Sequence, residues 1–151
     1  MKSSLPPFTL SLKRKLSRNV FMTHKKLHTI LMVEDEEDIQ TVAQIALEDI
    51  GGFDMAYCNS GKCALEKAPN LNPDLILLDV MMPGMDGVTT YNELRKFQQL
   101  KQTPIIFMTA KVQASEIEQY IRLGALGVIA KPFDPMTLSN ELNVLWEKNG
   151  N

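Results

Sequence analysis

The sequence predicts an α/β domain whose parallel five-stranded sheet is covered by helices on both faces. Five short apolar runs alternate strictly with segments in which apolar residues recur every three or four positions. The run at 75–78, Leu-Ile-Leu-Leu, has no polar face, which is typical of a strand buried on both sides. Such alternation favours parallel strands joined by right-handed helical crossovers. The length of 151 residues suits a single domain with a real core.

The first half of the chain supplies two of these strand and helix pairs. The run at 29–33 predicts a buried strand, and the three- and four-residue steps over 39–50 predict an amphipathic helix. Gly51 and Gly52 end this helix. A weaker strand is expected at 54–58. Ser60 follows it and can cap a short helix that runs to about Ala68.

The second half repeats the pattern three times, with strands expected at 75–78, 105–108 and 127–130. Asp86 can cap a helix through about Gln98. The next helix closes near Gly124. Asp134 is expected to cap the last helix, with Pro135 at its first position, where a missing N–H is tolerated. The apolar stripes of these two last helices consist of Ile117, Tyr120 and Ile121, and of Leu138, Leu142, Leu145 and Trp146.

The composition excludes several classes of protein. No apolar run approaches the roughly 18 to 20 residues that a membrane span needs. Two cysteines, Cys58 and Cys63, are too few for a disulfide scaffold, and we expect reduced thiols in a cytoplasmic protein. No nearby cysteine or histidine completes a metal-binding set with them.

Charge is distributed unevenly, although the net charge is only −2. Residues 1–33 hold seven basic side chains and no acidic one, and all 18 acidic residues lie from Glu34 onward. We expect 1–26 to be a basic, disordered arm, 27–148 the folded domain and 149–151 a tail. The cluster at 13–15 interrupts the only candidate for a signal peptide. A transit peptide, or a true start at Met22, remain alternatives.

Polar side chains follow four of the predicted strands at the point where each strand ends. Glu34 and Asp35 end the first strand and Asp79 ends the third. Thr109 ends the fourth, and Lys131 with its following proline ends the fifth. Because ligands of open parallel sheets bind beyond the carboxyl ends of the strands, these side chains are expected to converge.

This set of residue types suits phosphoryl chemistry on a carboxylate. Crowded carboxylates repel one another, and a hard cation such as Mg²⁺ relieves that repulsion. An aspartate can attack phosphorus to form an acyl phosphate. The Lys131 ammonium and the Thr109 hydroxyl can then stabilise charge on the phosphoryl oxygens. Each residue alone also fits a turn, a helix cap or a surface loop. Their joint placement at successive strand ends favours the functional interpretation.

The sequence resembles the receiver domains of two-component response regulators over about residues 27–148. The matching segments are 30–35, 73–87, 104–110, and 124–133, which begins Gly-Ala and ends Ala-Lys-Pro-Phe. The resemblance implies a flavodoxin-like doubly wound sheet of strand order 2-1-3-4-5 with five helices. It implies that the protein is a signalling phosphoacceptor of a phosphorelay, with slow self-dephosphorylation at most, rather than an enzyme.

The resemblance also assigns roles to individual residues. Asp79 would accept a phosphoryl group from a histidine kinase or histidine phosphotransfer protein. Mg²⁺ would be held by Glu34, Asp35, Asp79 and the backbone carbonyl of Met81. Lys131 would contact the phosphoryl oxygens and form a cis peptide bond with Pro132. Thr109 would swing toward the phosphoryl group, and the small Ala110 would leave it accessible.

One position departs from the pattern of the family. Many receivers carry an aromatic residue three positions before the lysine, where this chain has Val128. A valine is stiff and has no polar tip, so we expect the switch to work mainly through the backbone around 109–114, or to be weak. Met81 and Lys111 occupy positions that the family uses to tune the loss of the phosphoryl group.

The output is expected to be contact with a downstream protein. The acidic body disfavours nucleic acid, and the sequence from 1 to 151 contains no DNA-binding module. We expect the surface of the fourth helix, fifth strand and fifth helix, about 113–148, to shift on phosphorylation in a monomer or weak dimer. A phosphate-independent binding module is the main alternative. A Mg²⁺-dependent aspartyl-phosphate phosphatase is less well supported, because Met81 stands where such enzymes place a second aspartate.

Overall fold

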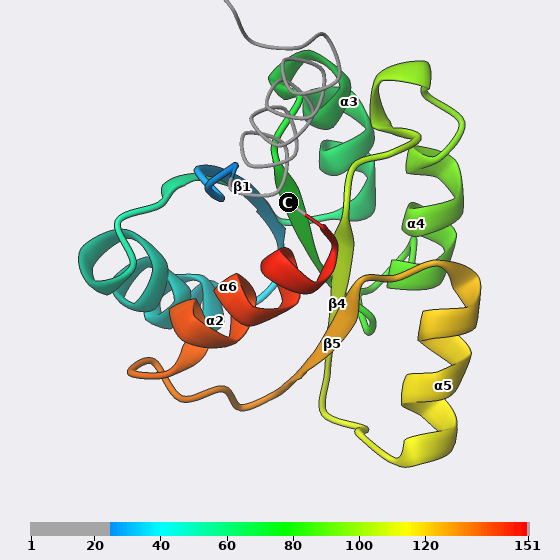
Figure 1. Ribbon diagram of the computed structural model, residues 1–151. Coiled ribbons are helices and arrows are strands. Elements are labelled where there is room, and N and C mark those ends of the chain that lie inside the picture. The colour runs from blue at the N-terminus through cyan, green and yellow to red at the C-terminus, as the bar shows by residue number, and fades with distance from the viewer. Residues whose placement is uncertain (1–24, 151) are drawn as a thin grey trace, which may run out of the picture.

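The computed structural model describes residues 25–150, and most of the predicted basic arm, including Met22, lies outside them (Figure 1). The strands are β1 (Thr29–Val33), β2 (Asp54–Cys58), β3 (Leu75–Asp79), β4 (Ile105–Thr109) and β5 (Gly127–Ala130). The α-helices are α2 (Glu37–Gln44), α3 (Gly61–Leu71), α4 (Gly87–Leu94), α5 (Ala114–Leu123) and α6 (Leu138–Lys148). A π-helical segment, η1 (Ile45–Ile50), continues α2, and a short 3₁₀ turn, η2 (Gln98–Leu100), follows α4.

The strands form one parallel sheet in the order β2-β1-β3-β4-β5. This confirms the predicted fold class and strand order. The register pairs Val33 of β1 with Cys58 and with Leu78, and Asp79 of β3 with Met108. Thr109 pairs with Ala130 of β5. The carboxyl ends of the three central strands and of β5 therefore meet at one edge of the sheet.

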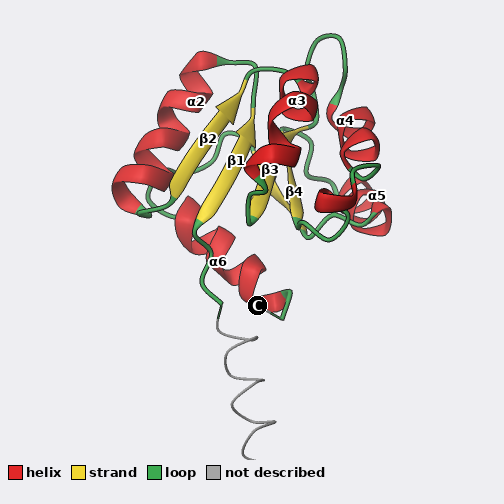
Figure 2. Cartoon of the chain, turned by 90° about the horizontal axis from the view of Figure 1, so that it is seen from above, coloured by secondary structure: helices red, strands yellow, loops and turns green. Residues whose placement is uncertain are grey.

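Helices cover both faces of the sheet (Figures 1 and 2). Helices α2 and α6 and the segment η1 bury their apolar side chains against one face, together with Met32 and Leu77. Helices α3, α4 and α5 pack on the other face, against Leu31, Leu78 and Phe107. Because neighbouring residues of a strand point to opposite faces, and helices cover both, β3 and β4 are apolar at every position before their polar last residues, Asp79 and Thr109. Every residue of β3 and β4 is buried accordingly.

Two helix boundaries in the first half differ from the prediction. The expected single helix over 39–50 is α2 followed by η1, where the N–H of Gly51 bonds the carbonyl of Ala46 five residues back. Ser60 caps α3 as predicted, since its hydroxyl accepts from the N–H of Cys63 at 3.1 Å. The helix continues to Leu71 rather than Ala68. Asn72, which follows it as the C-cap, lies in the left-handed region.

Two boundaries in the second half also differ. Asp86 caps α4 as predicted, but the helix ends at Leu94 rather than near Gln98. The guanidinium of Arg95 donates to the carbonyls of Leu100 and Thr103, both at 2.6 Å, and this fixes the reversal of the chain. Helix α6 begins at Leu138, because the Asp134 carboxylate accepts from the N–H of Met136 at 2.9 Å and forms a separate turn first.

No helix within residues 25–150 is long and apolar enough to cross a membrane.

Candidate functional site

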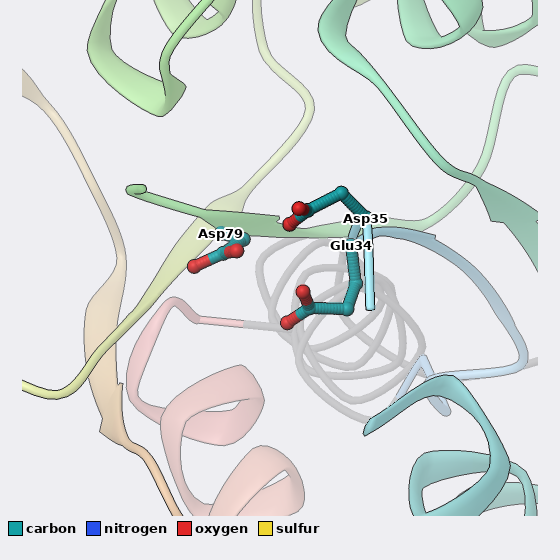
Figure 3. A group of neighbouring side chains, drawn as sticks. All are labelled: Glu34, Asp35 and Asp79. Atoms are coloured by element: carbon teal, nitrogen blue, oxygen red, sulfur yellow. The ribbon is translucent and has the colours of Figure 1, made fainter. Parts of the chain in front are cut away.

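Three carboxylates meet at the carboxyl edge of the sheet. Glu34 and Asp35 follow β1, and Asp79 is the last residue of β3. Their side chains face a common space (Figure 3), and one oxygen from each lies within 4.8 Å of the others. Glu34 and Asp79 are buried, while Asp35 is half-buried. Parallel pairing of β1 with β3 brings these residues together, as the positions of the strand ends predicted.

Lys131 joins two of the carboxylates from the end of β5. Its Nζ lies 2.8 Å from Glu34 Oε1 and 3.2 Å from Asp79 Oδ1. The lysine side chain is 14% exposed and that of Asp79 only 2% exposed, so water screens these ion pairs weakly. The peptide bond between Lys131 and Pro132 is cis, as the resemblance implied. The N–H of Lys131 donates to the Thr109 carbonyl at 2.9 Å, which ties the segment to β4.

The cluster contains more negative than positive charge. Burial raises the pKa of Glu34 to about 7, an effect that its hydrogen bond from Lys131 only partly offsets. Burial acts against the charge of Lys131, but the hydrogen bond to Glu34 and the negative charge of Asp79 outweigh it and raise the lysine pKa. One ammonium thus faces three carboxylates.

Two carboxylate oxygens in the cluster have no hydrogen-bond partner among the described residues, Asp35 Oδ1 and Asp79 Oδ2. Both oxygens of Glu34 are engaged, Oε1 by Lys131 and Oε2 by the N–H of Glu36 at 3.1 Å. Buried polar atoms in native proteins are normally paired. The two open oxygens therefore mark a place where a cation could be coordinated. A set of three carboxylates could hold a hard divalent cation such as Mg²⁺.

Thr109 reaches the same edge but bonds away from the cluster. It is buried, and its Oγ1 accepts from the N–H of Lys111 at 3.1 Å. Ala110 is exposed at the mouth of the site, and Val128 on β5 is half-buried. Met81 is 70% exposed, and its N–H approaches Asp79 Oδ1 at 3.4 Å. The Met81 carbonyl as a metal ligand stays a prediction.

Two supporting residues were missed by the sequence reasoning. A Cβ at Gly87 would lie 2.3 Å from the Asp79 carbonyl oxygen, so the start of α4 packs directly on the backbone of Asp79. A glycine immediately after the Asp86 cap was the available signal. Gln40 of α2 donates from Nε2 to the Glu34 carbonyl at 2.5 Å and holds the end of β1. No local pattern singles out this glutamine.

An apolar groove of about 380 Å³ opens beside the cluster, between α2 and the segment after β5. Ile39 and Val42 line it from the helix, and Lys131 joins it to the carboxylates. Its other lining residues are Asp38, Ala110, Pro132 and Phe133.

Comparisons with known proteins agree with this geometry. The model of the response regulator receiver domain family matches residues 30–143. The chain is 38% identical over 120 residues to the alkaline phosphatase synthesis transcriptional regulatory protein PhoP of Bacillus subtilis, and 32% identical over 122 residues to the regulatory protein AtoC of Escherichia coli. These alignments cover 80% and 81% of the chain. They cover only 49% of PhoP and 25% of AtoC, so the chain spans about half of these relatives or less.

Solved structures give the same result for the fold. The chemotaxis response regulator CheY4 of Vibrio cholerae superposes with a TM-score of 0.73 and 31% identity, over 80% of this chain and 99% of CheY4. A response regulator from Desulfuromonas acetoxidans superposes with a TM-score of 0.71 and 27% identity, over 80% and 98% of the two chains. From the matched family model, the strand order and the acidic cluster together, the chain belongs to the receiver domains of two-component response regulators.

Proposed function

We propose that Asp79 is the phosphoacceptor of this receiver domain. The single observation that carries the assignment is the state of its carboxylate. Oδ1 is held by Lys131, whereas Oδ2 is buried and has no partner among residues 25–150. A carboxylate oxygen that is fixed in place and otherwise unpaired is suited to attack an electrophile.

The reaction follows from this arrangement. One oxygen of Asp79 forms a bond to the phosphorus of a phosphohistidine in a partner protein. The bond from that phosphorus to the imidazole nitrogen breaks, and its electron pair stays on the nitrogen. Lys131 lies within hydrogen-bond reach of Asp79, so its ammonium can bind an oxygen of the transferring group. Thr109 would exchange its hydrogen bond from Lys111 for one to the new phosphoryl group.

The metal in this proposal is Mg²⁺, with Asp35 and Asp79 as its principal ligands and Glu34 close by. The open oxygen Asp35 Oδ1 fits that assignment, Asp79 would bind the ion through the oxygen that does not attack phosphorus, and the Met81 carbonyl is retained as a proposed further ligand. When bound, the ion would neutralise charge on the carboxylates and on the phosphoryl oxygens. Glu34 serves chiefly to orient Lys131, since both of its oxygens already have partners.

The donor would dock on the apolar groove beside the cluster. Val42, which lines the groove, is 36% exposed, and Ile45, the first residue of η1, is 47% exposed. A histidine kinase or histidine phosphotransfer protein could cover these side chains and bring its histidine to Asp79, because the groove is continuous with Lys131. We therefore expect substitutions of Val42 to slow transfer from a protein donor and to leave transfer from a small phosphodonor unchanged.

The surface that we propose to change on phosphorylation is formed by α5, β5 and α6, residues 113–148. β5 is an edge strand, with α5 and α6 on opposite faces beside it. The Thr109 loop leads directly into α5, so movement of the threonine can shift this helix. Backbone NMR shifts in 113–148 should change when a phosphoryl mimic binds, and unchanged shifts would disprove this output.

A downstream protein is the expected partner. We also propose that the domain spans residues 27–148, that the protein is cytoplasmic, and that it is a monomer or a weak dimer.

The first experiment is an intact-mass measurement after incubation with Mg²⁺ and a small phosphodonor. The protein should gain one phosphoryl mass, and an Asp79→Asn variant or omission of Mg²⁺ should abolish the gain. An Asp54→Asn variant is the matched control, because Asp54 lies exposed at the opposite end of the sheet. No gain in the wild-type protein, with Mg²⁺ binding established, would favour a phosphate-independent binding module. The half-buried Val128 in place of an aromatic switch residue is the observation that supports this alternative.

A further inference from the structure

The two cysteines of the chain lie side by side at the junction of β2 and α3. Cys58 is the last residue of β2 and is 2% exposed, while Cys63 is half-buried in the first turn of α3. Their sulfur atoms are 2.7 Å apart, and both thiols are free. A disulfide bond has a length of about 2.04 Å, so a movement of about 0.7 Å would bring the sulfurs to bonding distance.

Backbone contacts hold both cysteines in this position. The Cys58 carbonyl accepts from the N–H of Glu34 at 2.9 Å, which fixes the end of β2 against β1. The N–H of Cys63 donates to the Ser60 hydroxyl at 3.1 Å, which fixes the start of α3. Gly61 packs so closely that a Cβ there would lie 2.3 Å from Thr90 Oγ1 on α4. The thiols are therefore brought together by the fold, since neither backbone is free to move away.

We propose that Cys58 and Cys63 form a reversible intramolecular disulfide when the protein meets a peroxide. Cys63 is the site of first attack, because its half-buried side chain is reachable from solvent and that of Cys58 is not. The Cys63 sulfur takes one oxygen of the peroxide as the O–O bond breaks, giving a sulfenic acid and one water from hydrogen peroxide. The Cys58 sulfur then attacks the sulfenic sulfur, the S–O bond breaks, and a second water leaves.

The electron balance of this step closes with hydrogen peroxide as the only oxidant. Two thiols lose two protons and two electrons in total, and one peroxide is reduced to two waters. Neither Asp79 nor a metal takes part, so the disulfide does not depend on the proposed phosphoacceptor function. The sequence predicted two reduced thiols, and a spacing of five residues says nothing of whether a strand and a helix bring them into contact.

The test uses the full chain treated with hydrogen peroxide, then unfolded in denaturant after the peroxide is removed, and alkylated with a thiol reagent. The expected product loses two hydrogens, resists alkylation at both cysteines, and recovers both thiols after reduction. Lys62 lies between the cysteines, so trypsin separates them onto peptides 27–62 and 63–67. These peptides should stay joined in the oxidised sample and separate on reduction. A disulfide between two copies of the chain, seen as a reducible dimer, would overturn the proposal.

Two single variants identify the role of each sulfur. In Cys58→Ala, oxidation of Cys63 should stop at the sulfenic acid, which a 1,3-diketone probe then labels. The wild-type protein should not be labelled, because its sulfenic acid is converted into the disulfide. In Cys63→Ala, Cys58 should escape oxidation because it is buried, and it should be alkylated fully once the treated protein is unfolded. A thermal melt of each variant confirms that it is folded. Labelling of wild-type Cys63 equal to that in Cys58→Ala, or its oxidation to sulfinic acid, would contradict the proposal.

Discussion

At the scale of single residues, Gly87 shows how closely the scaffold approaches the proposed phosphoacceptor. A Cβ there would lie 2.3 Å from the Asp79 carbonyl oxygen and 2.7 Å from Val80 Cα, and backbone atoms cannot yield as a flexible side chain does. We expect Gly87→Ala to lower the free energy of unfolding by about 1 to 3 kcal/mol, as overpacking does. It should also slow phosphoryl uptake, since Asp79 must shift.

A matched control for this variant is Gly52→Ala. Gly52 has φ +74°, so an alanine is strained there by about 1 to 2 kcal/mol, but its Cβ would meet nothing within 4 Å. Urea unfolding should show comparable losses for both variants, while intact-mass kinetics should show slower uptake only for Gly87→Ala. Equal uptake in the two variants would mean that Gly87 supports stability alone.

Asp74 supplies a pH-dependent contribution to stability at the opposite end of the sheet. Burial opposes its charge, but the N–H groups of Thr29 and His28, both 3.0 Å from Oδ2, and the ammonium of Lys25 outweigh burial and lower the Asp74 pKa. Because the folded pKa lies below the ordinary value of 3.8, the contribution is present above that pH and disappears as pH falls through the folded pKa.

Asp74→Asn removes this charge and keeps an oxygen that can accept the same two hydrogen bonds. We expect the variant to lose about 1 kcal/mol of unfolding free energy at pH 7, the difference between charged and neutral hydrogen bonds. The deficit should begin to shrink below pH 3.8, where Asp74 of the unfolded chain takes up a proton, and it should disappear below the lower folded pKa, where the native carboxylate is protonated too. A deficit that stays constant between pH 7 and pH 3 would assign the effect to packing instead.

At the scale of elements, sequence patterns located strands better than helix ends. β1, β2 and β5 have the predicted bounds, and β3 and β4 extend one residue further, to Asp79 and Thr109. Strands were recognisable because a short buried run is apolar throughout. Helix ends depended on contacts beyond the local sequence, such as the Arg95 hydrogen bonds to Leu100 and Thr103. The π-helical turn of η1 has no distinguishing composition.

The candidate site was predictable in its location and less so in its detail. Strand-end residues were expected at one edge of the sheet, and the structure places Glu34, Asp35, Asp79 and Lys131 together there. The hydrogen bond that the Lys111 N–H donates to Thr109 Oγ1 depends on the loop conformation, which the sequence pattern does not specify. The contact of Cys58 with Cys63 likewise depends on how β2 and α3 meet.

Helix α5 is the least anchored of the five α-helices in residues 25–150. No residue in it is fully buried, and its N-cap, Gln113, makes no side-chain cap hydrogen bond. By contrast, α3 has the Ser60 cap and buries Gly61, Ala64 and Ala68. Few buried contacts and an open helix end give low local stability. This is the property expected of a helix that responds to Thr109, and amide hydrogen exchange should be faster in α5 than in α3.

Adding a cap to α5 should stabilise it. Gln113 has extended backbone angles, φ −70° and ψ 149°, which suit an N-cap serine. We expect Gln113→Ser to raise the free energy of unfolding by about 0.5 to 1 kcal/mol and to slow hydrogen exchange at 115–117. Gln113→Ala, which cannot accept a hydrogen bond, is the control. If both variants behave alike, the end of the helix is not limited by its missing cap.

At the scale of the whole molecule, the carboxylate cluster links stability to metal binding. A ligand that binds only the folded state stabilises it, by about 2.7 kcal/mol at one hundred times its dissociation constant. Mg²⁺ should therefore raise the melting temperature of the wild-type protein. Asp35→Asn should remove most of this rise, because Asp35 Oδ1 is one of the two open carboxylate oxygens.

The same variant should behave differently when Mg²⁺ is removed with a chelator. Three carboxylates then face the single ammonium of Lys131, and Asp35→Asn relieves part of their repulsion. The metal-free variant should melt no lower than the metal-free wild type, although it melts lower when Mg²⁺ is present. Asp54→Asn carries the same change of charge at the far end of the sheet and should keep the full response to Mg²⁺.

A Mg²⁺ response that survives in Asp35→Asn would place the ion elsewhere on the protein. A lower melting temperature of that variant in chelator would show that Asp35 has a structural role without metal.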